Sequence, residues 1–215
     1  MKKIIIILFA FSFLAYAGCR KRDTEEGVSK VVDVSKPTIN LKGDKFVSLS
    51  VGEAYADPGA TLIDDISGAQ SDIPAAEYTN LDVSTPGVYY MLYSAKNSNG
   101  YINNNVRYIA VTDYNDAVDL TGTYVRTLNG VEVEVTKVAP SFYKNSDMGG
   151  ASLSDALYFA IINDTTITGG VQFSESIGSE IATNSESLDL NDPYTLRYAL
   201  DAAGYGTAVR TFVKQ

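Results

Sequence analysis

The chain has 215 residues, 17 basic and 26 acidic side chains, a formal net charge of −9 and no histidine. The acidic balance argues against nucleic acid as a partner, because a phosphate backbone is bound by clustered Lys and Arg. Without histidine there is no Ser-His-Asp triad, no histidine general base and no ordinary zinc hydrolase site. The composition therefore favours a protein that is not an enzyme and has no organic cofactor.

The N-terminus has the pattern of an export signal. Two lysines precede an uncharged apolar stretch, residues 4–17, which is short for a permanent span, and small residues stand before Cys19, the only cysteine. This segment resembles the lipobox of bacterial lipoproteins, with Tyr16 where that family prefers leucine. The resemblance implies that residues 1–18 are a lipoprotein signal peptide and that Cys19 carries the lipid. An ordinary cleaved signal peptide is the alternative.

Residues 19–36 are polar and have no apolar period, which predicts a flexible tether. Asp23, Glu25 and Glu26 follow a basic triplet and resemble the surface-export signal of Bacteroides-type lipoproteins. We therefore expect a lipid-anchored protein of the outer membrane, displayed on the cell surface, with the periplasmic face as the alternative. Two or three acyl chains hold such a body on a membrane without a spanning helix.

Residues 37–113 have the pattern of a β domain. Val47, Leu49 and Val51 alternate with serines, which predicts a strand with one apolar face and one solvent-exposed polar face. Turns are predicted at 57–59 and 85–87, where Pro and Gly occur together. Strands are predicted at 88–95 and 101–112. Short strands and frequent turns favour an antiparallel sandwich.

Several motifs in this region resemble the bacterial immunoglobulin-like domain found repeatedly in surface proteins. The resemblance implies an immunoglobulin-like β-sandwich that acts as a spacer or an adhesion module, with no catalytic activity. The usual acidic-glycine run of that family is reduced here to Ile66-Ser67-Gly68. The motifs lie at Tyr55–Thr61, Asp64-Asp65, Thr85–Tyr89, Tyr93–Gly100 and Val111–Asp113.

Residues 114–118 form a predicted linker, and residues 119–215 form a second predicted β domain. Asn129-Gly130, a strong hairpin signal, separates a predicted strand at Leu120–Arg126 from a run in which Val131, Val133 and Val135 alternate with polar residues. Later strands are predicted at 157–162, 167–173, 195–200 and 207–214. Five motifs resemble the C-terminal domain of a family of Bacteroides surface lipoproteins, and the predicted fold is an antiparallel β-meander or barrel-like domain. The motifs are Gly122–Tyr124, Val135–Lys137, Phe142-Tyr143, Met148–Gly150 and Arg210–Lys214.

Fifteen tyrosines and no tryptophan suggest sugar binding, because aromatic faces stack on sugars and hydroxyl groups bond to them. The alternative is that tyrosine fills half-buried strand positions. The candidates for an exposed sugar platform in the second domain are Tyr143, Tyr158, Tyr194, Tyr198 and Tyr205.

Aspartates near the predicted turns are candidate calcium ligands, because calcium prefers oxygen donors. One set is Asp57, Asp64 and Asp65, and the other, at the junction, is Asp113, Asp116 and Asp119. Neither set has the spacing of an EF-hand, and the alternative is that these residues cap turns and keep edges soluble.

Two weaker motifs also occur in the second β region. Glu132 and Glu134 lie on one strand face and supply the carboxylates that a histidine-free glycosidase needs, although such a face is usually solvated. Asp164-Thr165-Thr166 resembles the Bacteroides O-glycosylation acceptor motif, which makes Thr165 a candidate modification site.

The leading hypothesis is a lipid-anchored surface binding or accessory protein that captures glycans for an outer-membrane uptake system. The alternatives are a structural spacer or assembly subunit that binds other envelope proteins, and, more remotely, the glycosidase.

Overall fold

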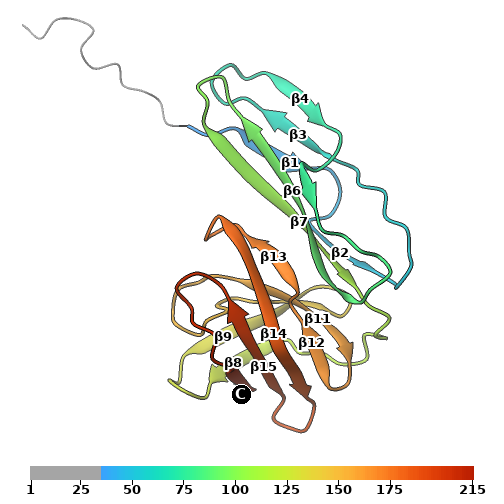
Figure 1. The fold of residues 1–215 in the computed structure, drawn as a ribbon, viewed down its shortest axis with the longest axis vertical. Helices are drawn as coiled ribbons and strands as arrows, with labels where there is room; N and C mark the ends of the chain where they lie inside the picture. The colour runs from blue at the N-terminus through green and yellow to red at the C-terminus, as the bar shows by residue number, and fades with distance from the viewer. Residues whose placement is uncertain (1–34) are drawn as a thin grey trace, which may run out of the picture. The chain divides into compact units, whose positions relative to one another are not determined.

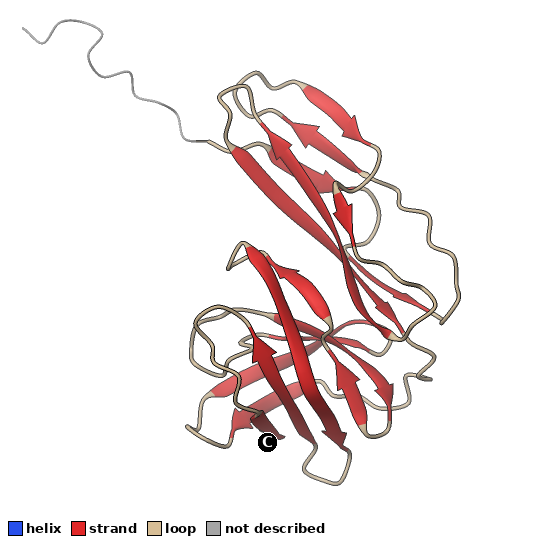
Figure 2. Cartoon of the chain, viewed as in Figure 1, coloured by secondary structure: helices blue, strands red, loops and turns tan. Residues whose placement is uncertain are grey.

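The computed structural model describes residues 35–215, and every regular element in that range is a β-strand (Figures 1 and 2). The predicted signal segment, Cys19 and most of the predicted tether lie outside the described residues. Within residues 35–215 we find no helix with the length and apolarity needed to cross a bilayer. The strands are β1 (Thr38–Leu41), β2 (Phe46–Leu49), β3 (Ala60–Ile63), β4 (Gln70–Ile73), β5 (Tyr78–Thr79), β6 (Gly87–Lys96), β7 (Ile102–Val111), β8 (Gly122–Arg126), β9 (Glu132–Ala139), β10 (Phe142–Asn145), β11 (Leu157–Asn163), β12 (Thr166–Thr168), β13 (Val171–Ser174), β14 (Ser179–Asp189), β15 (Thr195–Asp201) and β16 (Arg210–Lys214).

β1 to β7 form two sheets that pack face to face, which confirms the predicted immunoglobulin-like sandwich. One sheet has the order β1-β3-β4 and the other the order β2-β7-β6-β5. β2 runs parallel to β7, and all the other neighbours are antiparallel. Side chains of both sheets, among them Ile39, Leu49, Tyr93 and Ile109, form the core between the sheets.

β6 is buried on both of its faces, which explains why its sequence is apolar almost throughout. Met91 and Tyr93 point into the core of the sandwich. Val88 and Tyr90 point to the opposite face and pack against side chains from the second β region. Because neither face of such a strand is exposed to solvent, its sequence does not alternate between apolar and polar residues.

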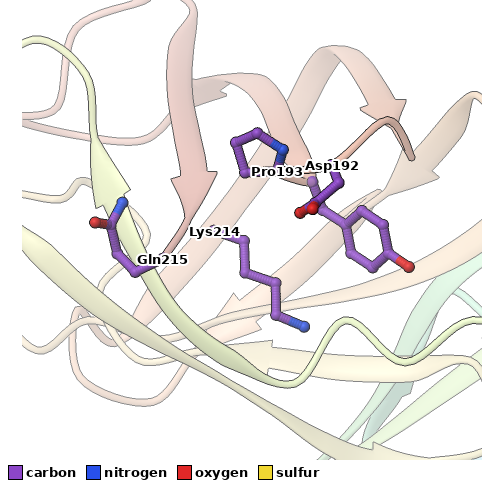
Figure 3. Close-up of a pocket in the computed structure, with 5 residues that line it drawn as sticks. Asp192, Pro193, Lys214 and Gln215 are labelled. Carbon is purple, nitrogen blue, oxygen red and sulfur yellow. The ribbon is translucent and has the colours of Figure 1, made fainter.

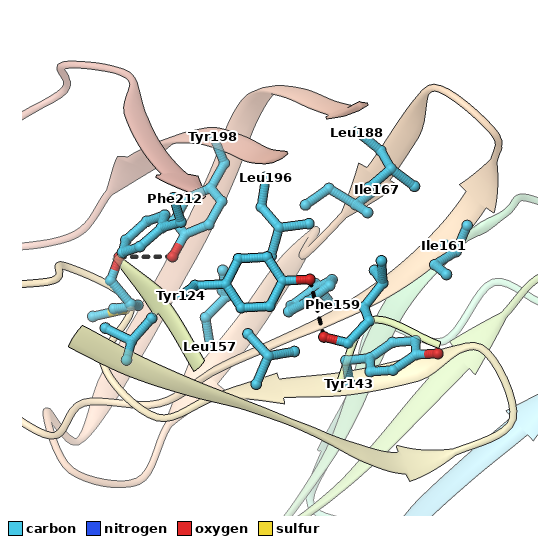
Figure 4. Close-up of a cluster of buried hydrophobic side chains, with 14 of the residues drawn as sticks. Tyr124, Tyr143, Leu157, Phe159, Ile161, Ile167, Leu188, Leu196, Tyr198 and Phe212 are labelled. Atoms are coloured by element: carbon cyan, nitrogen blue, oxygen red, sulfur yellow. Dashed lines mark hydrogen bonds between the residues drawn. The ribbon is translucent and has the colours of Figure 1, made fainter. Parts of the chain in front are cut away.

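β8 to β16 form one curled antiparallel sheet of nine strands, as the barrel-like prediction required (Figure 1). The order is β12-β11-β10-β9-β8-β16-β15-β14-β13, so β12 and β13 are its two edges. The edge strand β12 lies beside β14, the neighbour of the other edge, and the Leu188 N–H of β14 donates to the Thr165 carbonyl at 2.8 Å. The concave side holds a core of apolar and tyrosine side chains (Figure 4).

The single strand predicted at 167–173 is wrong, because the chain breaks into β12 and β13 at Gly169-Gly170. Gly170 has a φ of 57°, and a Cβ there would lie 2.6 Å from the Val88 carbonyl oxygen. The break carries the chain from one edge of the curled sheet to the other. β14 was among the strands that the sequence pattern did not predict, because its eleven residues are mostly polar.

An aromatic interface joins the sandwich to the curled sheet, and residues 35–215 form one compact unit. The rings of Tyr108 and Tyr158 lie 4.1 Å apart between centroids. The Tyr108 hydroxyl donates to the Phe173 carbonyl at 2.7 Å, and the Thr112 hydroxyl donates to the Ile161 carbonyl at 2.7 Å. The aromatic interface consists of Phe46, Tyr90, Tyr108, Phe142, Tyr158 and Phe173.

Candidate functional site

Tyr143 and Tyr198 are buried, so their expected place in an exposed sugar platform is wrong. Both are 0% exposed and lie in the core of the curled sheet (Figure 4). The Tyr143 hydroxyl donates to the Val118 carbonyl at 2.8 Å, and the Tyr198 hydroxyl to the Met148 carbonyl at 2.9 Å. Each hydroxyl thus anchors a loop to the sheet, which is how a buried tyrosine satisfies its polar end.

Tyr158 also fails as a platform residue, because its ring is part of the aromatic interface and only 8% of its surface is exposed. Burial, with a smaller effect of the Glu175 charge, raises the pKa of Tyr158 to about 12. Its role in this fold is to pack against Tyr108.

Tyr205 is half-buried and holds two loops together. Its hydroxyl donates to the Asp155 carboxylate, and the Arg210 guanidinium carbon lies 5.9 Å from the centroid of its ring. Burial, and then the hydrogen bond to Asp155, raises the pKa of Tyr205. The ring lies against Gly149, where an added Cβ would come within 2.4 Å of it. Both its ring and its hydroxyl are therefore engaged within the protein.

Tyr194 is the remaining predicted tyrosine, and it lines an open cavity of about 470 Å³ (Figure 3). The residue lies in the turn between β14 and β15, beside the end of β16. Its carbonyl accepts the N–H of Lys214 at 2.8 Å, and the Lys214 ammonium lies 5.2 Å from the centroid of its ring. Asp192, Pro193 and Gln215 complete the lining. We call this site the Tyr194 cavity.

The Tyr194 cavity combines an aromatic ring with groups of three hydrogen-bonding types. The Asp192 carboxylate accepts hydrogen bonds, the Lys214 ammonium donates them, and the Gln215 amide does both. Its volume lies within the range of small-molecule sites. A ligand with an apolar face and several hydroxyl groups matches this chemistry.

The junction aspartates, which are candidate calcium ligands, each have a hydrogen-bond or ion-pair partner within the protein. Asp113 accepts the Val51 N–H at 2.9 Å, and Asp119 accepts the Thr121 N–H at 2.9 Å. Asp116 bonds to the Lys137 ammonium at 2.6 Å. Residues 35–215 contain no group of three or more His, Cys, Asp or Glu side chains placed to hold a metal ion. Hydrogen bonds from Thr121 hold the pKa of Asp119 below its ordinary value, so this carboxylate caps its turn as an anion.

The first-domain aspartates also accept hydrogen bonds within the protein, and calcium binding by them stays a prediction. Asp64 accepts the N–H groups of Ile66, Ser67 and Ser98, and the hydrogen bond from Ser67 is the largest of the effects that lower its pKa. Asp65 accepts a hydrogen bond from the Asn97 amide at 3.4 Å.

Asp57 forms a buried ion pair with Arg107 that the pattern analysis missed. Arg107 is 0% exposed and lies on β7. It also donates to the Tyr93 hydroxyl oxygen at 2.6 Å and to the Asp44 carbonyl at 2.9 Å. The signal in the sequence was a lone arginine within an apolar strand, since a charge at such a position needs a buried partner.

The carboxylates considered for catalysis have structural partners or face solvent. Glu132 and Glu134 are exposed on β9, opposite the buried Val133 and Val135, as a solvated strand face predicts. A second cavity of about 480 Å³ is lined by Asp113 and Asp164. Both carboxylates have structural partners there, because Asp164 accepts a hydrogen bond from the Tyr114 hydroxyl at 2.9 Å and Asp113 accepts one from the Val51 N–H.

Thr165, the candidate glycosylation residue, is exposed in the turn between β11 and β12. Its hydroxyl donates to the Asn163 side-chain oxygen at 2.9 Å. Modification of Thr165 stays a prediction.

Comparison with known proteins finds no match among curated proteins, but it finds solved structures and one domain family. The chain is similar to the lipoprotein BT2262 from Bacteroides thetaiotaomicron, at 23% identity and a TM-score of 0.37, over 83% of this chain and 100% of that one. It is also similar to a structure of CBM51-2 in complex with GlcNAc and INT domains from Clostridium perfringens ZmpB, at 16% identity and a TM-score of 0.30. That match covers 83% of this chain and 48% of the other. Residues 39–111 match the family described as "Bacterial surface protein, Ig-like domain", so this segment is an immunoglobulin-like domain of the kind that bacterial surface proteins carry.

Proposed function

We propose that the protein is a lipid-anchored, non-catalytic surface protein that captures a glycan in the Tyr194 cavity. The N-terminal segment that ends at Cys19 supports the anchor, and the family match of residues 39–111 supports the surface location. The observation that supports glycan binding is the position of the Tyr194 ring. It lines an open cavity together with the Asp192 carboxylate, the Lys214 ammonium and the Gln215 amide. The outer-membrane location and a role in glycan uptake belong to the same proposal.

A single pyranose ring accounts for the chemistry of the Tyr194 cavity. Its apolar face would stack on the Tyr194 ring in place of the Lys214 ammonium, which would turn to donate to the hydroxyl groups of the sugar, and Asp192 would accept from them. The backbone pairing of Lys214 with Tyr194 places the two residues side by side, and the Lys214 ammonium lies 5.2 Å from the centroid of the ring.

Replacing Tyr194 with alanine is expected to weaken glycan binding by roughly tenfold or more, because it removes the stacking surface, worth about 1.5–3 kcal/mol when fully buried. The measurement is a glycan array with the detergent-solubilised full chain, followed by titration of any ligand found. The matched control is Tyr78→Ala, which removes an exposed tyrosine of the immunoglobulin-like domain. An array without a ligand, or equal affinity in Tyr194→Ala, contradicts the glycan proposal.

Replacing Cys19 with serine is expected to release the protein from the membrane fraction, because serine cannot form the thioether to the lipid. Each acyl methylene contributes about 0.8 kcal/mol of membrane binding, so the loss of two or three chains removes the anchor. Detergent phase partitioning of both proteins from a bacterial host and the intact mass of the wild type provide the measurement. An unmodified thiol in the wild-type protein would refute the anchor.

The second candidate function is a spacer or assembly subunit that binds other envelope proteins. The observation that favours this function is the aromatic interface, which joins the sandwich and the curled sheet into one compact unit. Its tyrosine rings are buried in that interface and are not exposed for ligand binding. A negative glycan array together with a specific protein crosslink in the envelope would favour this function.

A further inference from the structure

We propose that the ligand is an oligosaccharide free of acidic sugars, which extends from the Tyr194 cavity into a second subsite formed around Tyr114. This inference rests on the proposed glycan function and adds the length and the charge class of the ligand. The second subsite is the cavity of about 480 Å³ lined by Asp113 and Asp164, to which Tyr114 contributes an aromatic ring. We call it the Tyr114 cavity.

Both cavities lie at the same end of the curled sheet, as the antiparallel pairing of its strands requires. β8, β12 and β15 begin at this end, and β11, β14 and β16 end there. The loops at this end are residues 112–121, 164–165 and 190–194. The first two loops line the Tyr114 cavity, and the third lines the Tyr194 cavity together with the end of β16.

Hydrogen bonds join the walls of the two cavities. The Lys214 ammonium, which lines the Tyr194 cavity, donates to the Asp119 carbonyl at 3.4 Å. Asp119 directly follows Val118, which lines the Tyr114 cavity. The Leu188 N–H donates to the Thr165 carbonyl at 2.8 Å, so the turn of the Tyr114 cavity lies against β14, which leads into the loop of the Tyr194 cavity. The two cavities are therefore neighbours.

The Tyr114 side chain is half-buried and is held in position by its hydroxyl. The hydroxyl donates to the Asp164 carboxylate at 2.9 Å, and the ring packs against the core of the curled sheet. Burial, then the hydrogen bond and charge of Asp164, and then the Tyr143 and Tyr194 hydroxyls raise the pKa of Tyr114 to about 12. An effect of Tyr194 at Tyr114 requires that the two side chains lie near each other, because charge interactions weaken with distance.

The polar groups of the Tyr114 cavity match the hydroxyl groups of a sugar. From the described part of the chain, the Asp113 and Asp164 carboxylates each accept one hydrogen bond on Oδ1, which leaves Oδ2 to accept from a ligand. The side-chain oxygens of Asn115 and Asn163 accept backbone N–H groups, which leaves the amide nitrogens to donate. Acceptors and donors thus surround an aromatic ring here, as they do in the Tyr194 cavity.

The charges around the Tyr114 cavity exclude an acidic sugar. Two carboxylates line the cavity, and none of its lining residues is basic. Lys137 lies beside the same loop, but its ammonium pairs with Asp116 at 2.6 Å. The Lys214 ammonium lies by the Tyr194 ring. A carboxylate or sulfate group on a sugar in the Tyr114 cavity would therefore face two like charges, which disfavours its binding.

The test is a titration of the detergent-solubilised full chain with neutral oligosaccharides of glucose, mannose and galactose, each as a series of one to six units. We expect the affinity in one series to rise roughly tenfold or more from one unit to the longer chains, because a second sugar stacks on a second ring. In Tyr114→Ala this gain should disappear, while the affinity for the single sugar stays unchanged. The matched control is Tyr101→Ala, which removes a half-buried tyrosine of the immunoglobulin-like domain and should keep the gain.

The variant Asp164→Asn tests the charge class of the ligand. It removes one carboxylate and keeps an oxygen that accepts the Tyr114 hydroxyl. We expect it to bind uronate oligosaccharides about threefold or more tightly than the wild type does, with the affinity for neutral chains unchanged. Asp164 is exposed, so this variant should fold even if Tyr114→Ala does not, and circular dichroism checks both.

Equal affinity for one unit and for longer chains, or a gain in affinity that Tyr114→Ala retains, would overturn the second subsite. Tighter binding of uronate chains than of neutral chains by the wild type would overturn the charge class. In both cases, weaker binding by Tyr194→Ala would leave the glycan function in place. No binding in any series would instead overturn the glycan function and this inference together.

Discussion

Replacing Arg107 with methionine is expected to destabilise the protein by about 3–5 kcal/mol, because it leaves the Asp57 carboxylate without its cation in a largely buried site. The Tyr93 hydroxyl and the Asp44 carbonyl also lose hydrogen bonds. Urea unfolding followed by circular dichroism measures the change as a lower midpoint at unchanged slope.

Two control variants test whether the loss of stability in Arg107→Met comes from the unpaired buried carboxylate. Lys42→Met breaks the pair with Asp72, which joins the same charge types at 2.9 Å but in side chains that are 41% and 72% exposed, and it should cost at most about 1 kcal/mol. Arg107→Met/Asp57→Leu removes both buried charges and should be more stable than Arg107→Met alone. A double variant no more stable than the single one would show that packing, and not the unpaired carboxylate, accounts for the loss.

Replacing Tyr108 with alanine is expected to cost about 3–5 kcal/mol and to separate the unfolding of the sandwich from that of the curled sheet. Its ring is 1% exposed and packs on both Phe46 and Tyr158 at the centre of the aromatic interface. Truncating such a ring removes apolar burial and leaves a cavity. Once the interface is weakened, the two regions no longer need to unfold together. Urea unfolding, followed by tyrosine fluorescence and circular dichroism, should then show two transitions where the wild type shows one.

The control for this prediction is Tyr108→Phe, which keeps the ring and loses the hydrogen bond to the Phe173 carbonyl. Its expected cost is about 1–3 kcal/mol, since a buried carbonyl is left without its donor. If Tyr108→Ala still unfolds in one transition with a small shift of the midpoint, the interface does not couple the two regions.

Local sequence was sufficient for the fold class and for the longer strands apart from β14, but the short strands β1, β3, β4, β5 and β10 were not predicted. Alternation over Val131, Val133 and Val135 predicted β9, since side chains on a strand point to opposite faces in turn. Asn129-Gly130 predicted the β8–β9 hairpin, and Gly130 has a positive φ of 73° there. β14 was missed because the alternation test needs apolar residues, and its central residues are Thr183, Asn184 and Ser185.

The sequence by itself determined that this is an all-β, acidic, histidine-free protein, because composition and short-range periodicity are local properties of the chain. Only the tertiary structure decided which tyrosines are accessible. Because Tyr143 pairs with Phe159, Tyr143 and Tyr158 lie on opposite faces of the curled sheet, where contacts distant in sequence bury one in its core and the other against the sandwich. The same holds for Asp57, whose partner Arg107 lies 50 residues away along the chain. Burial and pairing of this kind depend on how separate strands pack, and no local pattern encodes that packing.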